Sequence, residues 1–109
     1  MTLSYQLDRV TVEKFVPSDS IGNYQLLDGA SRIRYVGRSD TDLQSRLLSH
    51  VEESPYRYFK YWTTDSPKSA YYEECKQYHK YENYGWLLNK NHPDRPENMP
   101  HLCCPICSQ

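Results

Sequence analysis

Two short segments in the first half of the chain are rich in residues that favour β-strands. They are residues 22–28 (GNYQLLD) and 32–38 (RIRYVGR), and the turn-forming residues Asp28 and Gly29 lie between them. This pattern predicts a β-hairpin whose loop consists of residues 28–31. The first two strands of the predicted sheet are therefore antiparallel neighbours.

The length of the loop fixes which residues of the predicted hairpin face one another. Counting back along both strands from this loop, Leu27 lies opposite Arg32 and Tyr24 lies opposite Tyr35. We therefore expect the two tyrosines to form a cross-strand pair on one face of the sheet.

A helix and a third strand are expected after the hairpin. Ser39 and Asp40 are suited to cap the N-terminus of a helix, which the sequence predicts over residues 41–53. The inward side of this helix comprises Leu43, Leu47 and Val51. Residues 56–64 (YRYFKYWTT) then predict the third strand.

A second helix is predicted over residues 66–81, where a serine followed by a proline marks the start. Beyond Trp86, prolines interrupt any regular spacing and predict an extended tail. The sequence thus predicts a small α+β fold with a three-stranded, mainly antiparallel sheet flanked by helices. Residues 1–90 would form this domain, and residues 91–109 would be an irregular tail that packs back on the second helix.

Composition and charge narrow the setting of the protein. With 109 residues the chain has the length of one small domain, which gains from an additional cross-link such as a metal site. The net charge of −1 does not by itself indicate a nucleic-acid partner. No apolar run reaches the roughly 18–20 residues of a membrane span, and the N-terminus lacks the apolar core of a signal peptide. These features predict a cytoplasmic protein with no membrane partner.

The four cysteines of such a protein are expected to be reduced thiols or metal ligands. Cys75 and His79 are four residues apart on the second predicted helix, so both side chains can point at one ion. Cys104 and Cys107 form a C-x-x-C motif, whose spacing lets two thiolates bind one zinc. The sequence predicts a structural Zn²⁺ site with these four ligands, which pins the tail to the helix.

Other ligands and another role are open for these residues. The rival ligands are His92, His101 and Cys103, and His101 together with the tail thiols is the main competitor. Free thiols and surface histidines are the ordinary alternative to a metal site.

The second predicted helix also carries two adjacent carboxylates, which helix geometry separates. At about 100° per residue, Glu74 falls on the same side as Ala70 and Gln77. Glu73 points instead to a polar side, where it can pair with Lys76 three residues later. Glu74 is therefore expected to be the inward carboxylate.

Four short motifs occur along the chain in a definite order. They are GNY at residues 22–24, YVG at 35–37, RLLSH at 46–50 and AYYEE at 70–74. In order and in approximate spacing they resemble the GIY-YIG nuclease family over more than half of the chain. Asn23 stands where the first motif of the family usually has an apolar residue, and Val36 replaces isoleucine in the second motif.

The resemblance implies a metal-dependent endonuclease that hydrolyses phosphodiester bonds in DNA. Tyr24 and Tyr35 would be the motif tyrosines that position or activate the attacking water. Arg46 would contact the scissile phosphate, and His50 would share in proton transfer or bind phosphate. Glu74 would hold the catalytic ion, Mg²⁺ or Mn²⁺, because magnesium favours one or two carboxylates together with water.

Each of these residues also has an ordinary structural alternative. The tyrosines could be a stacked pair that holds the hairpin, and Arg46 could pair with Asp42 one turn earlier. His50 could be a surface histidine, and Glu74 could be a buried glutamate bound by tyrosine hydroxyls.

Basic residues of the central region are candidates to hold the flanking nucleic-acid backbone. They are Arg34, Arg38, Arg57 and Lys60. The resemblance favours DNA over RNA, with a homodimer or an accessory targeting protein to compensate for the small size of the domain. The alternative is a catalytically inactive module with the same fold, which binds nucleic acid or serves as a zinc-stapled interaction domain.

Overall fold

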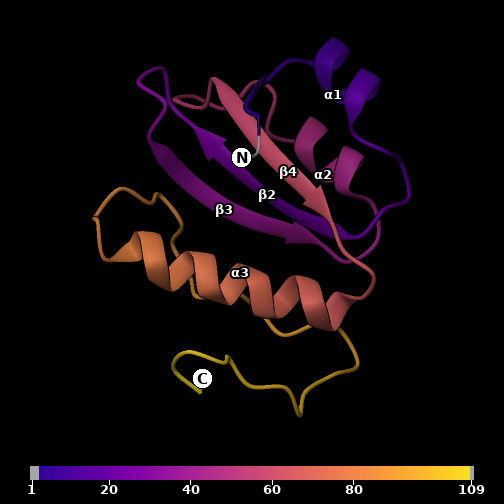
Figure 1. Ribbon diagram of the computed structural model, residues 1–109, viewed down its shortest axis with the longest axis vertical. Helices are drawn as coiled ribbons and strands as arrows, with labels where there is room; N and C mark the ends of the chain where they lie inside the picture. Colours follow the sequence, from indigo (N-terminus) through magenta and orange to yellow (C-terminus); the bar gives the residue numbers. More distant parts are fainter. Residues whose placement is uncertain (1–2, 109) are drawn as a thin grey trace.

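The computed structural model describes residues 3–108. In chain order its elements are β1 (Tyr5–Gln6), α1 (Arg9–Phe15), β2 (Gly22–Leu27), β3 (Ile33–Ser39), α2 (Leu43–Leu48), β4 (Tyr58–Thr63) and α3 (Pro67–Glu82). The strands form one antiparallel sheet in the order β1-β4-β2-β3. Figure 1 shows α1 and α2 over one face of this sheet and α3 over the other, so the sheet lies between two helical layers.

The predicted α+β class is confirmed, but the sheet has four strands where three were predicted. The additional strand, β1, pairs with β4 and is followed by α1, which was not predicted either. Asp8 caps α1, because its side chain accepts a hydrogen bond of 2.7 Å from the backbone N–H of Thr11. An aspartate directly before the helix-forming stretch was the sequence signal for this element.

The predicted hairpin forms, but its predicted register is wrong. Tyr24 pairs with Gly37 and not with Tyr35, so β3 is displaced by two residues from the prediction. Half of this displacement arises because Leu27 pairs with Ile33 across a longer loop, and half arises at an adjacent bulge. A two-residue displacement preserves the face on which each side chain lies, and the two tyrosines therefore still share a face.

The helix α3 begins where the sequence predicts. Ser66 is its N-cap and accepts a hydrogen bond from the backbone N–H of Ser69, while Pro67 occupies the first turn. Ala70 and Glu74 are both buried against the sheet side of the molecule. The predicted inward direction of Glu74 is therefore confirmed.

The helix predicted over residues 41–53 is shorter than expected. Its N-cap is Asp42, and the helix α2 ends before Ser49. The hydroxyl of Ser49 donates a hydrogen bond of 2.6 Å to the carbonyl of Arg46, which satisfies this carbonyl without a further helical turn. The strand β4 lies within the segment predicted to be the third strand.

Each face of the sheet has its own apolar cluster. The cluster toward α1 and α2 consists of Leu7, Val12, Val16, Tyr24, Leu26, Leu43, Leu47 and Phe59. The cluster toward α3 is built on Leu27, Ile33 and Val36. The buried Asn23 donates from Nδ2 to the carbonyl of Ala70 at 2.9 Å, and this hydrogen bond joins β2 to α3.

The tail packs back on α3 through a third, smaller cluster. Leu102 and Cys104 of the tail pack against Tyr71 and Cys75 of the helix. Beyond α3 the described chain, up to residue 108, contains no further helix or strand. No helix within residues 3–108 combines the length and the apolar character that crossing a membrane requires.

The chain between α3 and the tail runs along β3, the edge strand of the sheet. The backbone N–H of Leu88 donates to the carbonyl of Arg34 at 2.6 Å. The side chain of Asn89 accepts from the N–H of Val36 at 3.1 Å and donates to its carbonyl at 2.9 Å. These contacts place the segment after Leu88 beside the open edge of the sheet.

Candidate active site and metal cluster

A cleft of about 670 Å³ opens beside β3, where residues from both faces of the sheet meet. Tyr24, Tyr35 and Arg46 reach this cleft from the face toward α1 and α2, and Glu74 reaches it from α3. His50 is hydrogen-bonded to Tyr24. Four of the five predicted catalytic residues therefore line one cleft, and the fifth contacts it through Tyr24.

The two motif tyrosines form a stacked pair. Their ring centroids are 6.2 Å apart, and the ring planes are inclined by 16°. The nearly fully buried Tyr24 lies over Gly37, where an added Cβ atom would be 2.4 Å from Cζ of the tyrosine. Gly37 is therefore required for the close approach of this ring to the edge strand.

Tyr24, His50 and Glu53 form a continuous hydrogen-bonded chain. The Tyr24 hydroxyl lies 2.9 Å from Nε2 of His50, and Nδ1 of His50 lies 3.0 Å from a carboxylate oxygen of Glu53. Since an ionised carboxylate only accepts, Nδ1 of His50 carries the hydrogen of this bond, and in the tautomer with hydrogen on Nδ1 alone Nε2 accepts from Tyr24. Glu53 was not predicted, although its spacing of three residues from His50 was a visible signal.

Burial governs the ionisation of the motif tyrosines. It raises the pKa of Tyr24 well above its usual range, Tyr35 acts in the same direction, and Arg46 opposes both. Burial likewise raises the pKa of Tyr35. A free phenolate at Tyr24 is therefore unfavourable, and His50 is the group to which the hydroxyl can pass its proton.

Glu74 is held in the cleft by an arginine. Nη1 of Arg38 donates to Glu74 at 2.6 Å, while Nε of Arg38 donates to Asp40 at 2.8 Å. The guanidinium also lies over the ring of Tyr71, 5.2 Å from its centroid. Burial raises the pKa of Glu74, and the charge of Arg38 acts against this rise. Arg38, predicted to contact nucleic acid, is thus bound to two carboxylates of the protein.

Acidic groups outnumber basic groups around the cleft. Among the described residues that line it, five carboxylates face three cations, Arg38, Arg46 and Lys90. Carboxylate oxygens are the ligands that hard divalent cations such as Mg²⁺ prefer. Glu74 and Asp40, which share one guanidinium, are therefore a donor pair that fits the predicted ion.

Arg46 lies in the last turn of α2 and is exposed. Asp42, its alternative partner, accepts hydrogen bonds from the backbone N–H groups of Ser45 at 3.2 Å and Asp19 at 3.3 Å. Arg46 lines the cleft, and its contact with a phosphate stays a prediction.

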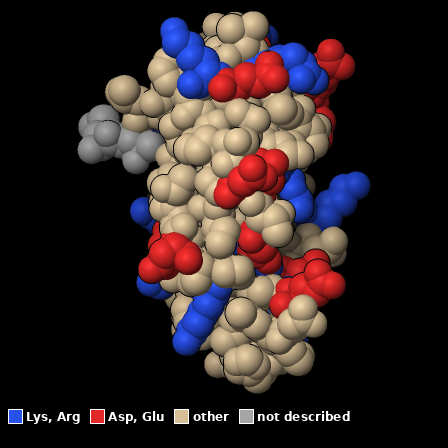
Figure 2. Space-filling view, turned by 90° about the vertical axis from the view of Figure 1, so that its right-hand side faces the viewer, with Lys and Arg blue, Asp and Glu red and all other residues tan. Residues whose placement is uncertain are grey.

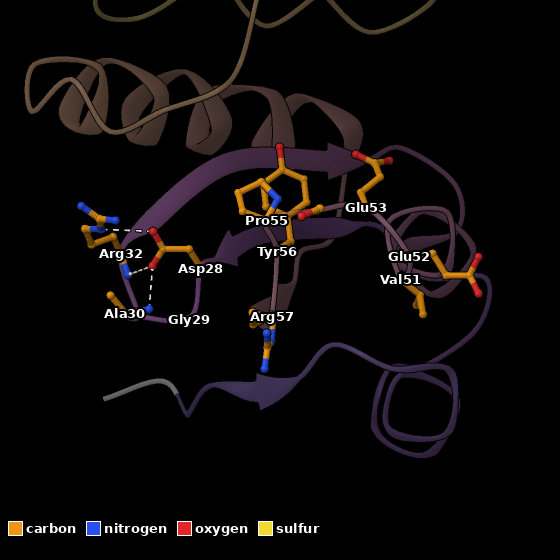
Figure 3. Close-up of a pocket in the computed structure, with 11 residues that line it drawn as sticks. Asp28, Gly29, Ala30, Arg32, Val51, Glu52, Glu53, Pro55, Tyr56 and Arg57 are labelled. Atoms are coloured by element: carbon orange, nitrogen blue, oxygen red, sulfur yellow. Dashed lines mark hydrogen bonds and ion pairs between the residues drawn. The ribbon is translucent and has the colours of Figure 1, made fainter.

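A second cleft, of about 520 Å³, shares Glu53 and Tyr56 with the first. Figure 3 shows its lining residues, among them Arg57 and the loop in which Asp28 bonds Ala30 and Arg32. Acidic side chains of the lining offset the basic ones. This cleft therefore does not form a basic site for a nucleic-acid backbone.

Two of the predicted basic residues line neither cleft. Nη1 of Arg34 lies 4.0 Å from Asp28, and Lys60 lies opposite Gln25 in the register of β2 and β4. Figure 2 shows basic and acidic side chains intermixed on one face of the molecule, with no broad basic surface among the described residues there. A nucleic-acid contact by the predicted basic residues stays a prediction.

Four potential metal ligands converge between α3 and the tail. One ligand atom from each of His79, His92, Cys104 and Cys107 lies within 4.8 Å of the other three. We call these four residues the His/Cys cluster. Two thiolates and two imidazoles are a frequent tetrahedral zinc set, so the cluster could hold a zinc ion.

Both histidines of the cluster are oriented through Nδ1. Nδ1 of His79 lies 3.2 Å from the carboxylate of Glu82, and Nδ1 of His92 lies 2.9 Å from the carbonyl of Pro93. Nε2 of His79 is buried without a hydrogen-bond partner among the described residues, and Nε2 of His92 lies 3.4 Å from the Cys107 sulfur. Metal-binding histidines typically have such a partner on the nitrogen that does not bind the metal.

The converging ligand set corrects the prediction, because His92 takes the place of Cys75. Cys75 is fully buried and packs against Tyr71 in the apolar cluster of the tail. Burial raises the pKa of its thiol to about 12, and its hydrogen bond with Cys104 acts in the same direction. Cys75 therefore neighbours the His/Cys cluster as a protonated thiol.

The C-x-x-C segment itself favours a thiolate at Cys104. The backbone N–H of Ile106 donates to the sulfur of Cys104 at 3.4 Å. Burial alone would raise the pKa of this thiol, but hydrogen bonds lower it to about 6, first those from the backbone of Cys107 and Ile106 and then those from the side chains of His92 and Cys75. The other rival ligands, His101 and Cys103, are exposed and lie outside the cluster.

Comparisons of this chain with protein-family models, with curated proteins and with solved structures find no match. The resemblance to the GIY-YIG family therefore rests on the four sequence motifs.

Proposed function

We propose that this protein is a metal-dependent endonuclease that hydrolyses phosphodiester bonds in DNA. The observation that carries the proposal is the hydrogen-bonded chain from Glu53 through His50 to Tyr24, which ends at the cleft. The same cleft contains Arg46 and Glu74. An imidazole between a carboxylate and a hydroxyl is a typical arrangement for general acid–base catalysis.

Proton transfer in this proposal runs along that chain. The attacking water gives a proton to the oxygen of Tyr24 while Tyr24 passes its own proton to Nε2 of His50. Because burial raises the pKa of Tyr24, a concerted transfer avoids the free phenolate. Glu53 stabilises the imidazolium that forms, and Tyr35, stacked on Tyr24, orients the water.

Charged groups in the same cleft would bind the substrate phosphate. The guanidinium of Arg46 would bind two phosphate oxygens and offset the charge that develops on them. Glu74, together with Asp40, would hold Mg²⁺ or Mn²⁺ in competition with Arg38. When bound, this ion supplies positive charge beside the phosphate and the leaving oxygen.

The zinc ion of the His/Cys cluster has a structural role in this proposal. All four ligands are protein side chains, which leaves no position for a reacting water in a tetrahedral site. Its ligands come from α3, from the segment after α3 and from the tail, so the ion would join these three parts.

The test of the proposed activity is cleavage of a panel of substrates. Purified protein is incubated with linear, nicked, flapped and branched DNA and with RNA, with and without Mg²⁺. We expect DNA cleavage only with the divalent ion, and Glu74→Ala should abolish product because it removes a ligand of that ion. Glu73→Ala is the matched control, since Glu73 lies outside the cleft and binds Gln77.

Two outcomes would change the proposal. An inactive Glu73→Ala beside an active Glu74→Ala would contradict the role of Glu74. An inactive wild type that still binds DNA would indicate a nucleic-acid-binding module with the same fold. One observation favours this second candidate. Nη1 of Arg38 lies 2.6 Å from Glu74 and pairs with the carboxylate that would otherwise bind the catalytic ion.

A further inference from the structure

We propose that zinc bound in the His/Cys cluster fastens residues 88–94, the wall of the cleft on the side of the tail, and thereby positions Lys90 to bind substrate phosphate. The part that concerns substrate rests on the proposed nuclease function. The part that concerns zinc and the wall stands on the structure of the cluster alone.

His92 connects the cluster to the cleft. Every residue from 88 to 94 lines the cleft, and these residues follow one another without interruption. Among the described residues, His92 is the one that belongs both to this wall and to the His/Cys cluster. A metal bound to its imidazole would therefore hold the wall at its middle.

The wall has no regular structure to hold it in place. Its first residues are anchored on β3 through Leu88 and Asn89. After the wall, the side chain of Arg95 donates a hydrogen bond to the carbonyl of Leu102. The stretch between these two anchors has neither helix nor strand, and His92 lies at its centre.

A bound metal ion would hold the four side chains of the His/Cys cluster together. Nε2 of His79 is buried and has no hydrogen-bond partner among the described residues, which is unfavourable unless another group binds it. The four ligand atoms of the cluster lie within 4.8 Å of one another, so one bound Zn²⁺ would join all four side chains. Zn²⁺ with two thiolates and two neutral imidazoles is electrically neutral, so loss of the metal should separate the ligands and release His92.

The position of the wall matters because cations are scarce in the cleft. Arg38 is bound to two carboxylates, so Arg46 and Lys90 are the other cations that line it. Arg46 belongs to α2, whereas Lys90 belongs to the wall. Fixing the wall thus sets the distance between the two positive groups that can meet the phosphates of one strand.

The first experiment measures zinc and the wall directly on the full chain. Zinc is quantified by elemental mass spectrometry, and hydrogen exchange is followed for residues 88–94. We expect about one zinc per chain in the wild type. His92→Ala and Cys107→Ser should each lose the zinc, and exchange in the wall should become at least about tenfold faster while β2 is unchanged. Cys103→Ser, at an exposed residue outside the cluster, is the control and should match the wild type.

A wild type that binds no zinc would overturn the proposal, and so would zinc loss in both variants with unchanged exchange in the wall. The second experiment measures binding of a labelled DNA oligonucleotide with Ca²⁺ in place of Mg²⁺. Lys90→Ala should keep the zinc and the slow exchange but bind about tenfold more weakly, and His92→Ala should lose at least as much.

Binding by Lys90→Ala at wild-type strength would overturn the role of the lysine. If no form of the protein binds DNA, the proposed nuclease function fails. The zinc and exchange measurements would still decide whether the metal fastens the wall.

Discussion

The two sides of the cleft are built by different means. On the hairpin side, Tyr24 lies in a central strand, packs in the core and bonds His50, which in turn bonds Glu53. On the tail side, residues 88–94 have no regular structure and are anchored on β3 and, in our proposal, by zinc. Tyr24 thus lies on a strand, and hydrogen bonds tie His50 and Glu53, which follow α2, to it. The wall lies on a segment that, in our proposal, needs the metal as a cross-link.

This difference separates two kinds of functional loss. A change on the hairpin side should lower turnover without releasing the wall. Loss of zinc should weaken substrate binding and leave the chain of hydrogen bonds between Tyr24 and Glu53 in place. Variants that damage both properties equally would show that the two sides are not independent.

On the hairpin side a large effect on turnover is expected at His50, which accepts the proton of Tyr24 in the proposed mechanism. His50→Ala should lower the single-turnover rate of cleavage by about 10³-fold, as for loss of a general base, while zinc content stays unchanged. Glu53→Gln should cost about tenfold, because the amide still occupies the site but stabilises the imidazolium less well. Glu52→Gln is the control and should cleave at the wild-type rate, and a rate loss there would argue against a specific role of Glu53.

A smaller effect on stability is expected at Gly37. In Gly37→Ala the new methyl group would collide with the buried ring of Tyr24, whose Cζ is 2.4 Å from the Cβ position. Such overpacking should lower the free energy of unfolding by about 1–3 kcal/mol in urea denaturation. At Gly29 the nearest atom is 3.9 Å away, so Gly29→Ala should change stability by less than about 0.5 kcal/mol. Equal stability of the two variants would contradict the packing described for Tyr24.

The smallest effect is a pH dependence that reports the burial of Tyr24. Burial raises the pKa of Tyr24 in the folded protein, so just above pH 10 the unfolded chain loses this proton first. The folded state then binds more protons, and its stability is intact below about pH 10 but falls above it by up to about 1.4 kcal/mol per pH unit. Urea denaturation should show a smaller alkaline slope in Tyr24→Phe than in the wild type. Identical slopes would indicate that Tyr24 is not the group responsible.

The sequence was sufficient to predict the direction of a side chain where the period of one helix alone decides it. The period of the second helix separated Glu74 from Glu73, and Glu74 is buried in the cleft. The hairpin register could not be predicted in the same way, because Asp28 organises a wider loop. Its side chain accepts hydrogen bonds from the backbone N–H groups of Ala30 and Arg32, and the adjacent bulge adds a further displacement.

The ligands of the His/Cys cluster could also be predicted only in part. Cys104 and Cys107 were found from their local spacing, and both belong to the cluster. His92 could not be chosen over its rivals, since its position depends on contacts of the preceding residues with β3. Cys75 has the correct helical spacing from His79, but its side chain is used in apolar packing.

The cleavage rate of Tyr24→Phe beside the wild type tests the central claim most directly. It is measured under single-turnover conditions on a DNA substrate that the wild type cuts with Mg²⁺. Phenylalanine keeps the stack on Tyr35 but removes the hydroxyl that bonds His50 and that, in the proposed mechanism, takes the proton of the attacking water. We predict a rate at least about 10²-fold lower with unchanged DNA affinity. Cleavage by Tyr24→Phe at the wild-type rate, or a wild type that cuts none of the DNA substrates, would contradict the account.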